Sequence, residues 1–397
     1  MKTLGLFVFI DALGWEVLRR HPDFLAGVAP ERKPLETILG YSSACDPSII
    51  SGLTPAQHKL WSSYYYLPDG NSPFAWTRIF GFLPRAVTSR ARVRHYLSKL
   101  VKKVCGIRGY FQLYNVPFDL LPLFHYAEWK RIWELDGLPV GTSIFDMMSA
   151  AGQKWYVHDS GKNDEGKLAD LHIALSQGEI SLAYISLGKL DALMHAEGTQ
   201  SARVGKLLAW YDGQIRELMD AARRSYDDVR LYVFTDHGMH DIHTGYDLQK
   251  DVETLGLTFG KDYVAFYDST MGRFWSLNPQ AKARLESLLR HHSMGRILYD
   301  DELRSLGVYF PDAQYGDIIF LMNSGVQIAP SFMGRKAIAG MHGFHPSDPD
   351  SKAMICSNQP LPPSLTNIQQ IFGLMCTATG IQPPPERSVP RERDPRP

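Results

Sequence analysis

The sequence predicts an α/β protein: a mostly parallel central sheet flanked by helices, with an inserted cap subdomain. Two observations predict the sheet. Largely apolar runs recur along the chain, as expected for strands buried on both faces, and amphipathic helical stretches separate them. A third observation predicts the insertion, because residues 70–118 contain no Asp or Glu, which sets this stretch apart from the rest of the chain.

The predicted strands are four apolar runs, and the first of them, residues 4–10, ends at Asp11. The other three runs occupy residues 182–187, 229–235 and 318–322. The main helical patterns occupy residues 202–223 and 279–292. We expect all four runs to be strands of the central sheet. Since ligands bind beyond the carboxyl ends of the strands in open α/β sheets, polar groups after these runs are the candidate site residues.

Residues 60–138 are predicted to form the inserted cap, between core segments 1–59 and 139–380. The nine basic residues of its 70–118 window are Arg78, Arg85, Arg90, Arg92, Arg94, Lys99, Lys102, Lys103 and Arg108. An apolar stripe at helical spacing runs through the same window and consists of Val93, Tyr96, Leu97, Leu100, Val101 and Val104. The tail, residues 381–397, is rich in Pro and Arg and is expected to be disordered.

The composition excludes several classes of protein. Lys and Arg together number 42, as do Asp and Glu, so the chain of 397 residues is neither a globally basic nucleic-acid binder nor an acidic solvating protein, and it has no nucleic-acid-binding motif. Four Cys are too few for a disulfide-built fold, which favours a reducing, cytoplasmic location. The run at residues 4–10 is too short for a membrane span, and no signal-peptide cleavage site follows it.

Three carboxylates and three imidazoles stand directly after predicted strands or in short polar loops. They are Asp11, Asp191, His195, Asp236, His237 and His342. Asp191 and His195 are four residues apart, so one helical turn directs both side chains at a single ion. Asp236 and His237 are adjacent and can share an ion only where the backbone bends, which Gly238 permits. These residues are enough for two tridentate metal sites, and the mixture of carboxylate and imidazole suits zinc or manganese.

Residues 40–55 (GYSSACDPSIISGLTP) hold the candidate nucleophile. Two serines, Ser42 and Ser43, precede an Asp-Pro pair at 46–47 that predicts a helix start, and Gly52 closes the helix. A serine at a helix N-terminus lies next to unpaired backbone N–H groups and a positive dipole, which favours attack on a phosphate. The alternative is that both serines only cap the helix.

The ordered set of motifs resembles the alkaline phosphatase superfamily, in the branch of type I phosphodiesterases and nucleotide pyrophosphatases. The matching segments are Asp11 after the first strand, GLTPAQH at 52–58, DALMHAEG at 191–198, DHG at 236–238 and HG at 342–343. In this branch the nucleophile lies ten residues before the Gly of the Gly-x-x-Pro segment, which gives Ser42, with Ser43 as the competitor. Thr is usual at that position in the branch, so the Ser leaves both monoesters and diesters open as substrates.

The resemblance implies an alkaline-phosphatase-like core and two metal ions roughly 4 Å apart. The implied ligands are Asp191, His195 and His342 for one ion, and Asp11, Asp236 and His237, with the Ser42 oxygen, for the other. Ser42 would attack phosphorus in line and form a phosphoseryl intermediate, which metal-activated water then hydrolyses. The implied cofactors are two divalent ions, zinc or manganese, and the implied substrate is a phosphate ester linked to a nucleotide, a sugar or a lipid.

Two other functions stay open on the sequence. A phosphotransferase would pass the phosphoryl or head group from the same serine to a sugar or lipid hydroxyl. A non-enzymatic anion-binding scaffold would carry a degenerate site, and the complete set of Asp and His ligands speaks against it. His58, inside the GLTPAQH segment, is expected to be structural rather than a ligand.

The basic insertion predicts where an anionic partner binds. The chain is neutral as a whole, so the +9 charge of residues 70–118 creates a local positive field. We expect this field to help capture an anionic substrate, with Arg92, Arg94, Lys99 and Lys103 as contributors. One alternative is peripheral contact of the apolar stripe and its basic flanks with an anionic membrane, and another is a core helix whose basic residues are merely solvated.

Overall fold

A six-stranded, mostly parallel sheet forms the centre of the protein in the computed structural model, which describes residues 2–82, 88 and 90–383. The predicted α/β class is confirmed, because within this sheet only β16 runs against the other strands. The strands, in spatial order, are β2 (Glu31–Leu35), β16 (Ala353–Ser357), β7 (Asp228–Phe234), β1 (Thr3–Ile10), β6 (Leu182–Leu187) and β5 (Trp155–Val157). The part of the expected disordered tail from residue 384 onward lies outside the described residues.

Strand β1 lies in the middle of the sheet, and its side chains alternate between two buried faces. Phe7 and Phe9 point into one core, which α2, α6 and α13 complete. Leu6 and Val8 point into a second core, which α1, α7, α8 and α9 complete. Because both faces are covered by helices, the sequence of β1 is apolar at consecutive positions rather than at alternate ones.

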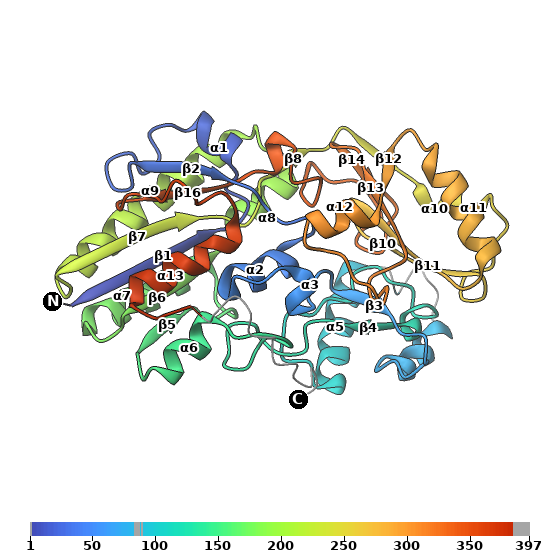
Figure 1. Cartoon of the computed structure of the whole chain (residues 1–397), viewed down its shortest axis with the longest axis horizontal. Helices are drawn as coiled ribbons and strands as arrows, with labels where there is room; N and C mark the ends of the chain where they lie inside the picture. The colour runs from blue at the N-terminus through green and yellow to red at the C-terminus, as the bar shows by residue number, and fades with distance from the viewer. Residues whose placement is uncertain (1, 83–87, 89, 384–397) are drawn as a thin grey trace.

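The helices that cover the central sheet are seen around β1 and β7 in Figure 1. They are α1 (Trp15–Arg20), α2 (Ser42–Ser51), α6 (Ile144–Ala150), α7 (Asp164–Gln177), α8 (Lys189–Glu197), α9 (Ala202–Arg223) and α13 (Ile371–Thr379), with the short α3 (Pro55–His58) after α2. The helix predicted over residues 202–223 is confirmed as α9, whose N-cap Ser201 accepts a hydrogen bond from the backbone N–H of Arg203.

A second lobe is built around a four-stranded antiparallel sheet, on the right in Figure 1. Its strands, in spatial order, are β10 (Tyr263–Tyr267), β11 (Met271–Ser276), β13 (Ile318–Met322) and β12 (Gly295–Leu298), with α10 (Leu248–Glu253), α11 (Pro279–Arg290) and α12 (Asp300–Ser305) nearby. The expectation that residues 318–322 belong to the central parallel sheet is therefore wrong. An apolar run shows only that a strand is buried on both faces, and β13 meets that condition inside this smaller sheet.

The inserted segment packs on the second lobe and shares its hydrophobic core. Its elements are β3 (Tyr64–Tyr66), η1 (Ala75–Phe82), α5 (Ala91–Cys105), η2 (Leu121–Leu123) and β4 (Phe124–Tyr126). A buried ion pair between Arg273 and Asp268, at 2.7 Å, joins the two parts, since Arg273 also donates to the Tyr64 carbonyl and Ser62 donates to Asp268. The predicted domain boundaries at 60 and 138 stay a prediction.

The apolar stripe predicts which face of helix α5 is buried, and the structure buries a different face. The stripe residues that lie exposed are Tyr96 (70%), Leu100 (43%) and Val104 (56%), whereas Arg94 and Ser98 are buried. Polar contacts explain this orientation, because the Ser98 hydroxyl accepts from the Leu113 N–H at 2.9 Å and Arg94 donates to the Val116 carbonyl at 2.8 Å. Arg94 is consequently not part of an exposed basic rim.

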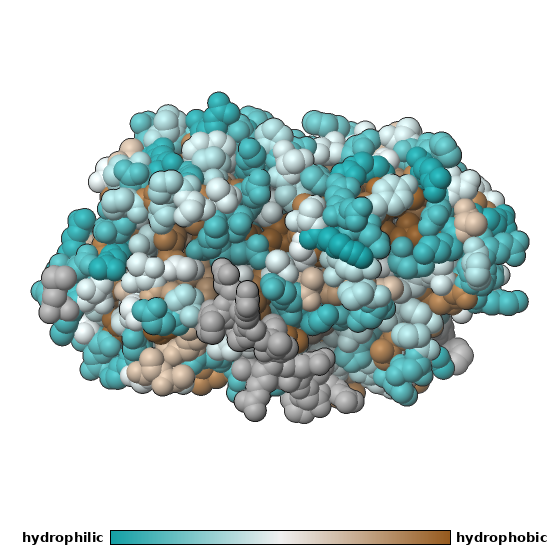
Figure 2. Space-filling view, viewed as in Figure 1, coloured by the Kyte–Doolittle hydropathy of each residue, from teal (hydrophilic) through white to brown (hydrophobic). Residues whose placement is uncertain are grey.

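Two short strand pairs accompany the two larger sheets. They are β8 (His240–Asp241) with β15 (Gly340–Met341), and β9 (Thr244–Tyr246) with β14 (Val326–Ile328). The face drawn in Figure 2 is mostly hydrophilic, with apolar side chains visible in its hollows. In the described part of the chain, no helix combines the length and the apolar character that a membrane crossing needs.

Candidate metal centre

The predicted ligands gather where β1, β6 and β7 end. Asp11 directly follows β1, and α8, which starts two residues after β6, carries Asp191 and His195. Asp236 and His237 follow β7. These three strands are parallel neighbours, so their carboxyl ends meet at one edge of the sheet, as the sequence predicts.

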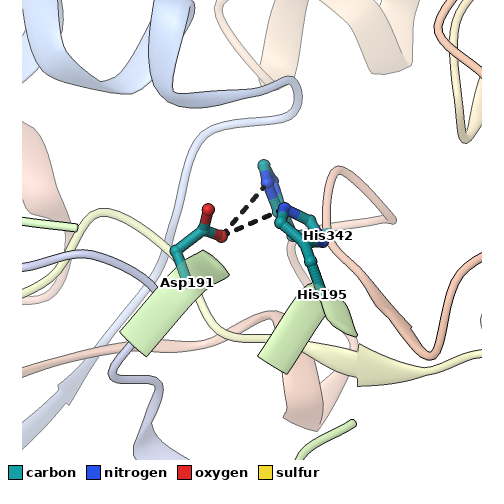
Figure 3. Close-up of side chains that lie close together, drawn as sticks. All are labelled: Asp191, His195 and His342. Carbon is teal, nitrogen blue, oxygen red and sulfur yellow. Dashed lines mark ion pairs between the residues drawn. The ribbon is translucent and has the colours of Figure 1, made fainter. Parts of the chain in front are cut away.

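The first ligand set consists of Asp191, His195 and His342, drawn in Figure 3. Asp191 Oδ1 lies 3.2 Å from His195 Nε2 and 3.8 Å from His342 Nε2. The two α8 residues are one helical turn apart, and His342 follows β15 from a distant part of the chain. One ligand atom from each residue lies within 4.8 Å of the others, so the three can surround a single ion.

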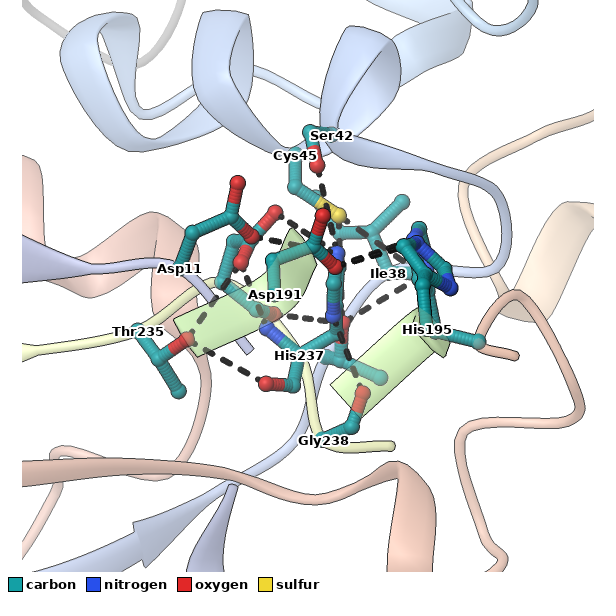
Figure 4. Close-up of polar contacts among 12 residues, drawn as sticks. Asp11, Ile38, Ser42, Cys45, Asp191, His195, Thr235, His237 and Gly238 are labelled. Carbon is teal, nitrogen blue, oxygen red and sulfur yellow. Dashed lines mark hydrogen bonds and ion pairs between the residues drawn. The ribbon is translucent and has the colours of Figure 1, made fainter. Parts of the chain in front are cut away.

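The second ligand set consists of Asp11, Asp236 and His237. Figure 4 shows two of them, Asp11 and His237, below Ser42. His237 Nε2 lies 3.2 Å from Asp236 Oδ2 and 3.8 Å from Asp11 Oδ1. The backbone bends at Asp236, and the Asp236 carboxylate accepts a hydrogen bond from the His237 N–H at 3.0 Å. The predicted bend therefore lets the adjacent residues face one point.

The two ligand sets touch through a pair of stacked imidazole rings, one from each set. The rings of His237 and His342 stack with their centroids 3.7 Å apart and their planes 13° from parallel. His195 donates from Nδ1 to the Gly340 carbonyl at 2.8 Å, and His237 donates from Nδ1 to the Gly238 carbonyl at 3.0 Å. A carbonyl can only accept, so each Nδ1 carries the proton and each Nε2 offers a lone pair to a metal.

The ligand atoms fit cations because they are buried without hydrogen bonds of their own. Within the described residues, four buried side-chain atoms of the two sets have no hydrogen-bond partner: Asp11 Oδ1, Asp191 Oδ1, Asp236 Oδ2 and His342 Nδ1. Burial, followed by the charges of Asp191 and Asp236, raises the pKa of Asp11 well above its usual range. Burial, followed by the neighbouring His237, lowers the pKa of His342. Divalent cations would offset the cost of burying charged carboxylates and would bind neutral imidazoles, so the residues present fit two metal ions.

Ser42 is the first residue of α2, and its hydroxyl points at the second ligand set in Figure 4. Ser42 Oγ lies 3.2 Å from His237 Nε2. The competitor, Ser43, makes no hydrogen bond to these ligands in the part of the chain that the structure describes. The predicted helix start at Asp46 is wrong, because α2 already begins at Ser42 and Pro47 lies inside it. Pro47 cannot donate a helical hydrogen bond, and its ring crowds the carbonyl of Ser43 one turn earlier.

Two charged residues next to the ligands were missed by the sequence reasoning. Asp46 lies one helical turn after Ser42, and burial followed by the charge of Asp236 raises its pKa well above the usual range. Lys167 is buried, donates to the Ser186 carbonyl at 2.7 Å and partly offsets the negative charge of these carboxylates. The spacing of four from Ser42 is the signal that could have revealed Asp46. Nothing in the sequence reveals Lys167.

The remaining histidines near the motifs have other partners. His58 is fully buried and hydrogen-bonds Ser48 at 2.8 Å, which confirms its structural role. His240 hydrogen-bonds Ser351 at 2.9 Å and forms a separate group with Asp348 and Asp350.

Two adjoining sets of carboxylate and imidazole ligands with a serine at a helix start are the arrangement that metal-dependent enzymes acting on phosphoric esters use. The family model described as type I phosphodiesterase / nucleotide pyrophosphatase matches residues 40–345, and the chain belongs to this family. The protein is a metal-dependent phosphoric-ester hydrolase of the alkaline phosphatase superfamily. The matched range includes Ser42 and every expected ligand except Asp11.

Solved structures of the same fold cover nearly the whole chain. The murine and the human ectonucleotide pyrophosphatase / phosphodiesterase 5 each match with a TM-score of 0.67 and 13% identity, over 96% of both chains. An inactive variant of the murine protein in complex with AMP matches with a TM-score of 0.66 and 13% identity, over 97% of this chain and 96% of that one. At this identity the likeness shows the fold alone. No curated protein matches the sequence.

Proposed function

We propose that the protein hydrolyses phosphodiester or pyrophosphate bonds with two divalent metal ions and Ser42 as the nucleophile. One observation carries the proposal: the Ser42 hydroxyl lies 3.2 Å from His237, inside a pair of ligand sets joined by stacked imidazoles. The serine and the ligands come from separate segments of the chain, so the fold, and not closeness in the sequence, brings Ser42 to the ligand sets.

The two ligand sets would each hold one ion. Asp191, His195 and His342 form one set, and Asp11, Asp236 and His237 form the other. When bound, the ions supply Lewis-acid stabilisation of the phosphate oxygens and lower the pKa of the attacking hydroxyl. Zinc suits these oxygen and nitrogen ligands, and manganese is the alternative.

The chain's own residues position the phosphate and form the covalent intermediate. The positive end of α2 favours an anionic phosphate next to Ser42. As Ser42 Oγ forms a bond to phosphorus, its hydroxyl proton passes to solvent water, the bond to the departing oxygen breaks, and that oxygen takes a proton from water. A water molecule then attacks phosphorus, the bond between phosphorus and Oγ breaks, and one proton of the water restores the serine hydroxyl while its OH stays on the released phosphate product.

The substrate we favour is a phosphate ester that contains a nucleotide. The family name and the AMP bound to the murine structure support this choice. Sugar-linked and lipid-linked esters, and phosphate monoesters, form the rest of the candidate set.

Metal loading provides the first test. We expect about two zinc or manganese ions per chain, as two-metal phosphoryl-transfer sites hold, and turnover of diesters that stops after chelation and returns after metal addition. Elemental analysis and a screen of mono- and diesters measure both. A chain without metal affinity would indicate an anion-binding scaffold, and phosphorylated acceptor in the presence of an added alcohol would indicate a phosphotransferase.

The exposed face of α5 leads to a second test, of electrostatic capture. Arg92, Lys99 and Lys103 are exposed on this helix, whereas Arg94 is buried. Replacing the three exposed residues by Gln should lower kcat/KM about three- to tenfold at low salt, because steering of an anionic substrate is lost. The deficit should shrink at about 0.1 M salt and above, where the Debye length falls to about 10 Å. Equal kinetics at low salt would contradict capture.

The same variant tests the membrane alternative and, with it, the location of the protein. We propose a cytoplasmic location, because all four cysteines are unpaired thiols. Peripheral membrane contact through Tyr96, Leu100 and Val104 would appear as co-sedimentation with phosphatidylserine vesicles that the triple Gln variant loses.

A further inference from the structure

The tip of the β10–β11 hairpin in the second lobe places one side chain, Thr270, between two loops of the candidate metal centre. Thr270 is fully buried and directly precedes β11. Backbone bonds hold the tip: the Asp268 N–H donates to the Met271 carbonyl and the Met322 N–H donates to the Thr270 carbonyl, both at 2.9 Å. The buried ion pair of Asp268 with Arg273 braces the same tip. The second lobe therefore fixes the position of the Thr270 side chain.

The Thr270 hydroxyl bonds to both loops. Thr270 Oγ1 lies 2.8 Å from the Gly343 carbonyl and 2.9 Å from the Tyr41 hydroxyl. A carbonyl can only accept, so Thr270 donates its one hydroxyl proton to Gly343, and Tyr41 donates to Thr270. The Thr270 N–H donates back to the Tyr41 hydroxyl at 3.1 Å. The direction of every hydrogen bond of the Tyr41–Thr270 pair is thereby determined.

The two residues that bond to Thr270 are chain neighbours of the nucleophile and of a ligand. Tyr41 is the N-cap of α2 and directly precedes Ser42. Gly343 directly follows His342 and has a φ of +89°. A Cβ on Gly343 would lie 2.8 Å from the Tyr41 ring and 2.9 Å from the Thr270 hydroxyl oxygen, so a larger residue does not fit. The two loops therefore lie in direct contact.

The contacts between these two loops continue through the ligand sets and return to the nucleophile. The Tyr41 ring packs edge-on against the His342 ring, with the centroids 5.6 Å apart. His342 stacks on His237 at 3.7 Å, and His237 Nε2 lies 3.2 Å from Ser42 Oγ. Ser42 is joined to Tyr41 by a peptide bond, which closes the circuit. The circuit contains a ligand of each set, and Thr270 is the member that the second lobe supplies.

We propose that Tyr41 and Thr270 are positioning residues, which hold His342 at a fixed separation from Ser42. The inference rests on the proposed function and adds to it a role for the second lobe. Without the Thr270 hydroxyl, the Gly343 carbonyl loses this donor and the Tyr41 hydroxyl loses its acceptor. Buried polar groups without partners are costly, so the His342 loop would shift until the Gly343 carbonyl finds another donor. The first ligand set would then bind its ion less tightly.

Zinc affinity tests the pair without any turnover. The zinc-loaded full chain is titrated with a competing chelator, which gives the affinity for each ion. We expect Thr270→Val, which removes the hydroxyl and keeps the shape, to weaken one ion about tenfold and the other less than about twofold, because the pair supports a single ligand set. Tyr41→Phe should act in the same direction, and Thr270→Ser, which keeps the hydroxyl, should bind like the wild type. Unchanged affinity in Thr270→Val, equal losses for both ions, or a Thr270→Ser variant as weak as Thr270→Val would overturn the proposal.

Two further variants show through which residue the pair acts. In a His342→Ala background, adding Thr270→Val should change the affinity for the remaining ion less than about twofold, because the route through His342 is already lost. A tenfold loss in that background would contradict the route. Tyr226→Phe is the matched control, since the Tyr226 hydroxyl accepts from the Ile180 N–H at 3.2 Å, ahead of β6 and at the edge of the central sheet opposite the ligands. It should bind both ions like the wild type.

Hydrogen exchange distinguishes failure of the positioning role from failure of the proposed function. Metal-free wild type and Thr270→Val are exchanged in deuterium oxide, and peptides that cover residues 40–46 and 339–346 are compared by mass spectrometry. We expect exchange about threefold faster or more in both peptides of the variant, because both loops lose a shared anchor, and equal rates in peptides of α7. Equal rates everywhere would refute the coupling of the two loops. If the wild type binds no zinc and cleaves no ester, the proposed function fails, and the exchange rates still decide whether Thr270 joins the loops.

Discussion

Ser42→Ala is expected to lower kcat by at least about a thousandfold, because it removes the oxygen that forms the bond to phosphorus. Metal content and thermal unfolding should stay close to those of the wild type, since the six ligands come from other segments and the side-chain contacts that are lost are those to His237 and Asp236. Steady-state kinetics, elemental analysis and a thermal melt measure the three quantities. A brief incubation with a phosphorus-labelled substrate followed by acid should label the wild type and not the variant.

Ser43→Ala is the matched control for that variant. It removes the same atom from the next residue of the same helix, and it should keep most of the activity. An inactive Ser43→Ala beside an active Ser42→Ala would move the nucleophile by one residue. Full activity in both variants would rule out a seryl intermediate altogether.

His342→Ala is expected to have the second-largest effect. It removes a direct ligand of the first set, together with the ring that stacks on His237 at 3.7 Å. Loss of a residue that merely supports a ligand costs about 10- to 100-fold in metal affinity, so the loss of a ligand should cost at least that. Elemental analysis after dialysis should therefore find one ion per chain instead of two, and kcat should fall accordingly.

His291→Ala serves as the control for the loss of an imidazole. His291 follows α11, is exposed and hydrogen-bonds only the Ser287 carbonyl in the described structure, at 3.2 Å. Its removal should change neither metal content nor kcat. Unchanged metal binding and activity in His342→Ala itself would remove this residue from the site and undermine the two-ion proposal.

The candidate ligands could be predicted because local rules place them. Asp11 and Asp236 directly follow buried strands, and parallel neighbouring strands must end at one edge. Asp191 and His195 are one helical turn apart, which determines their common direction without any knowledge of the fold. The ordered motifs supplied what local rules could not, namely that the distant His342 joins this pair.

The predictions were wrong where one local sequence pattern is compatible with more than one tertiary arrangement. The apolar run of β13 indicates burial on both faces, yet the same burial is available in the smaller antiparallel sheet. In α5, two polar side chains, Arg94 and Ser98, find backbone partners and so turn toward the protein, which leaves Tyr96 at the surface. The surface pocket that Arg94 and Lys336 line together could not be predicted, because only the folded chain brings these two residues to one place.

The central place of β1 has a consequence for biosynthesis. Gly5 pairs with Leu182 on one side and with Arg230 on the other, so β1 is synthesised well before either of its neighbouring strands. At about 5–20 residues per second, the ribosome needs on the order of ten seconds or more to supply them. During that time the apolar strand must be sheltered by early helices or by a chaperone. The metal ligands are complete only when His342 has emerged, so loading of the first ligand set follows the synthesis of that segment.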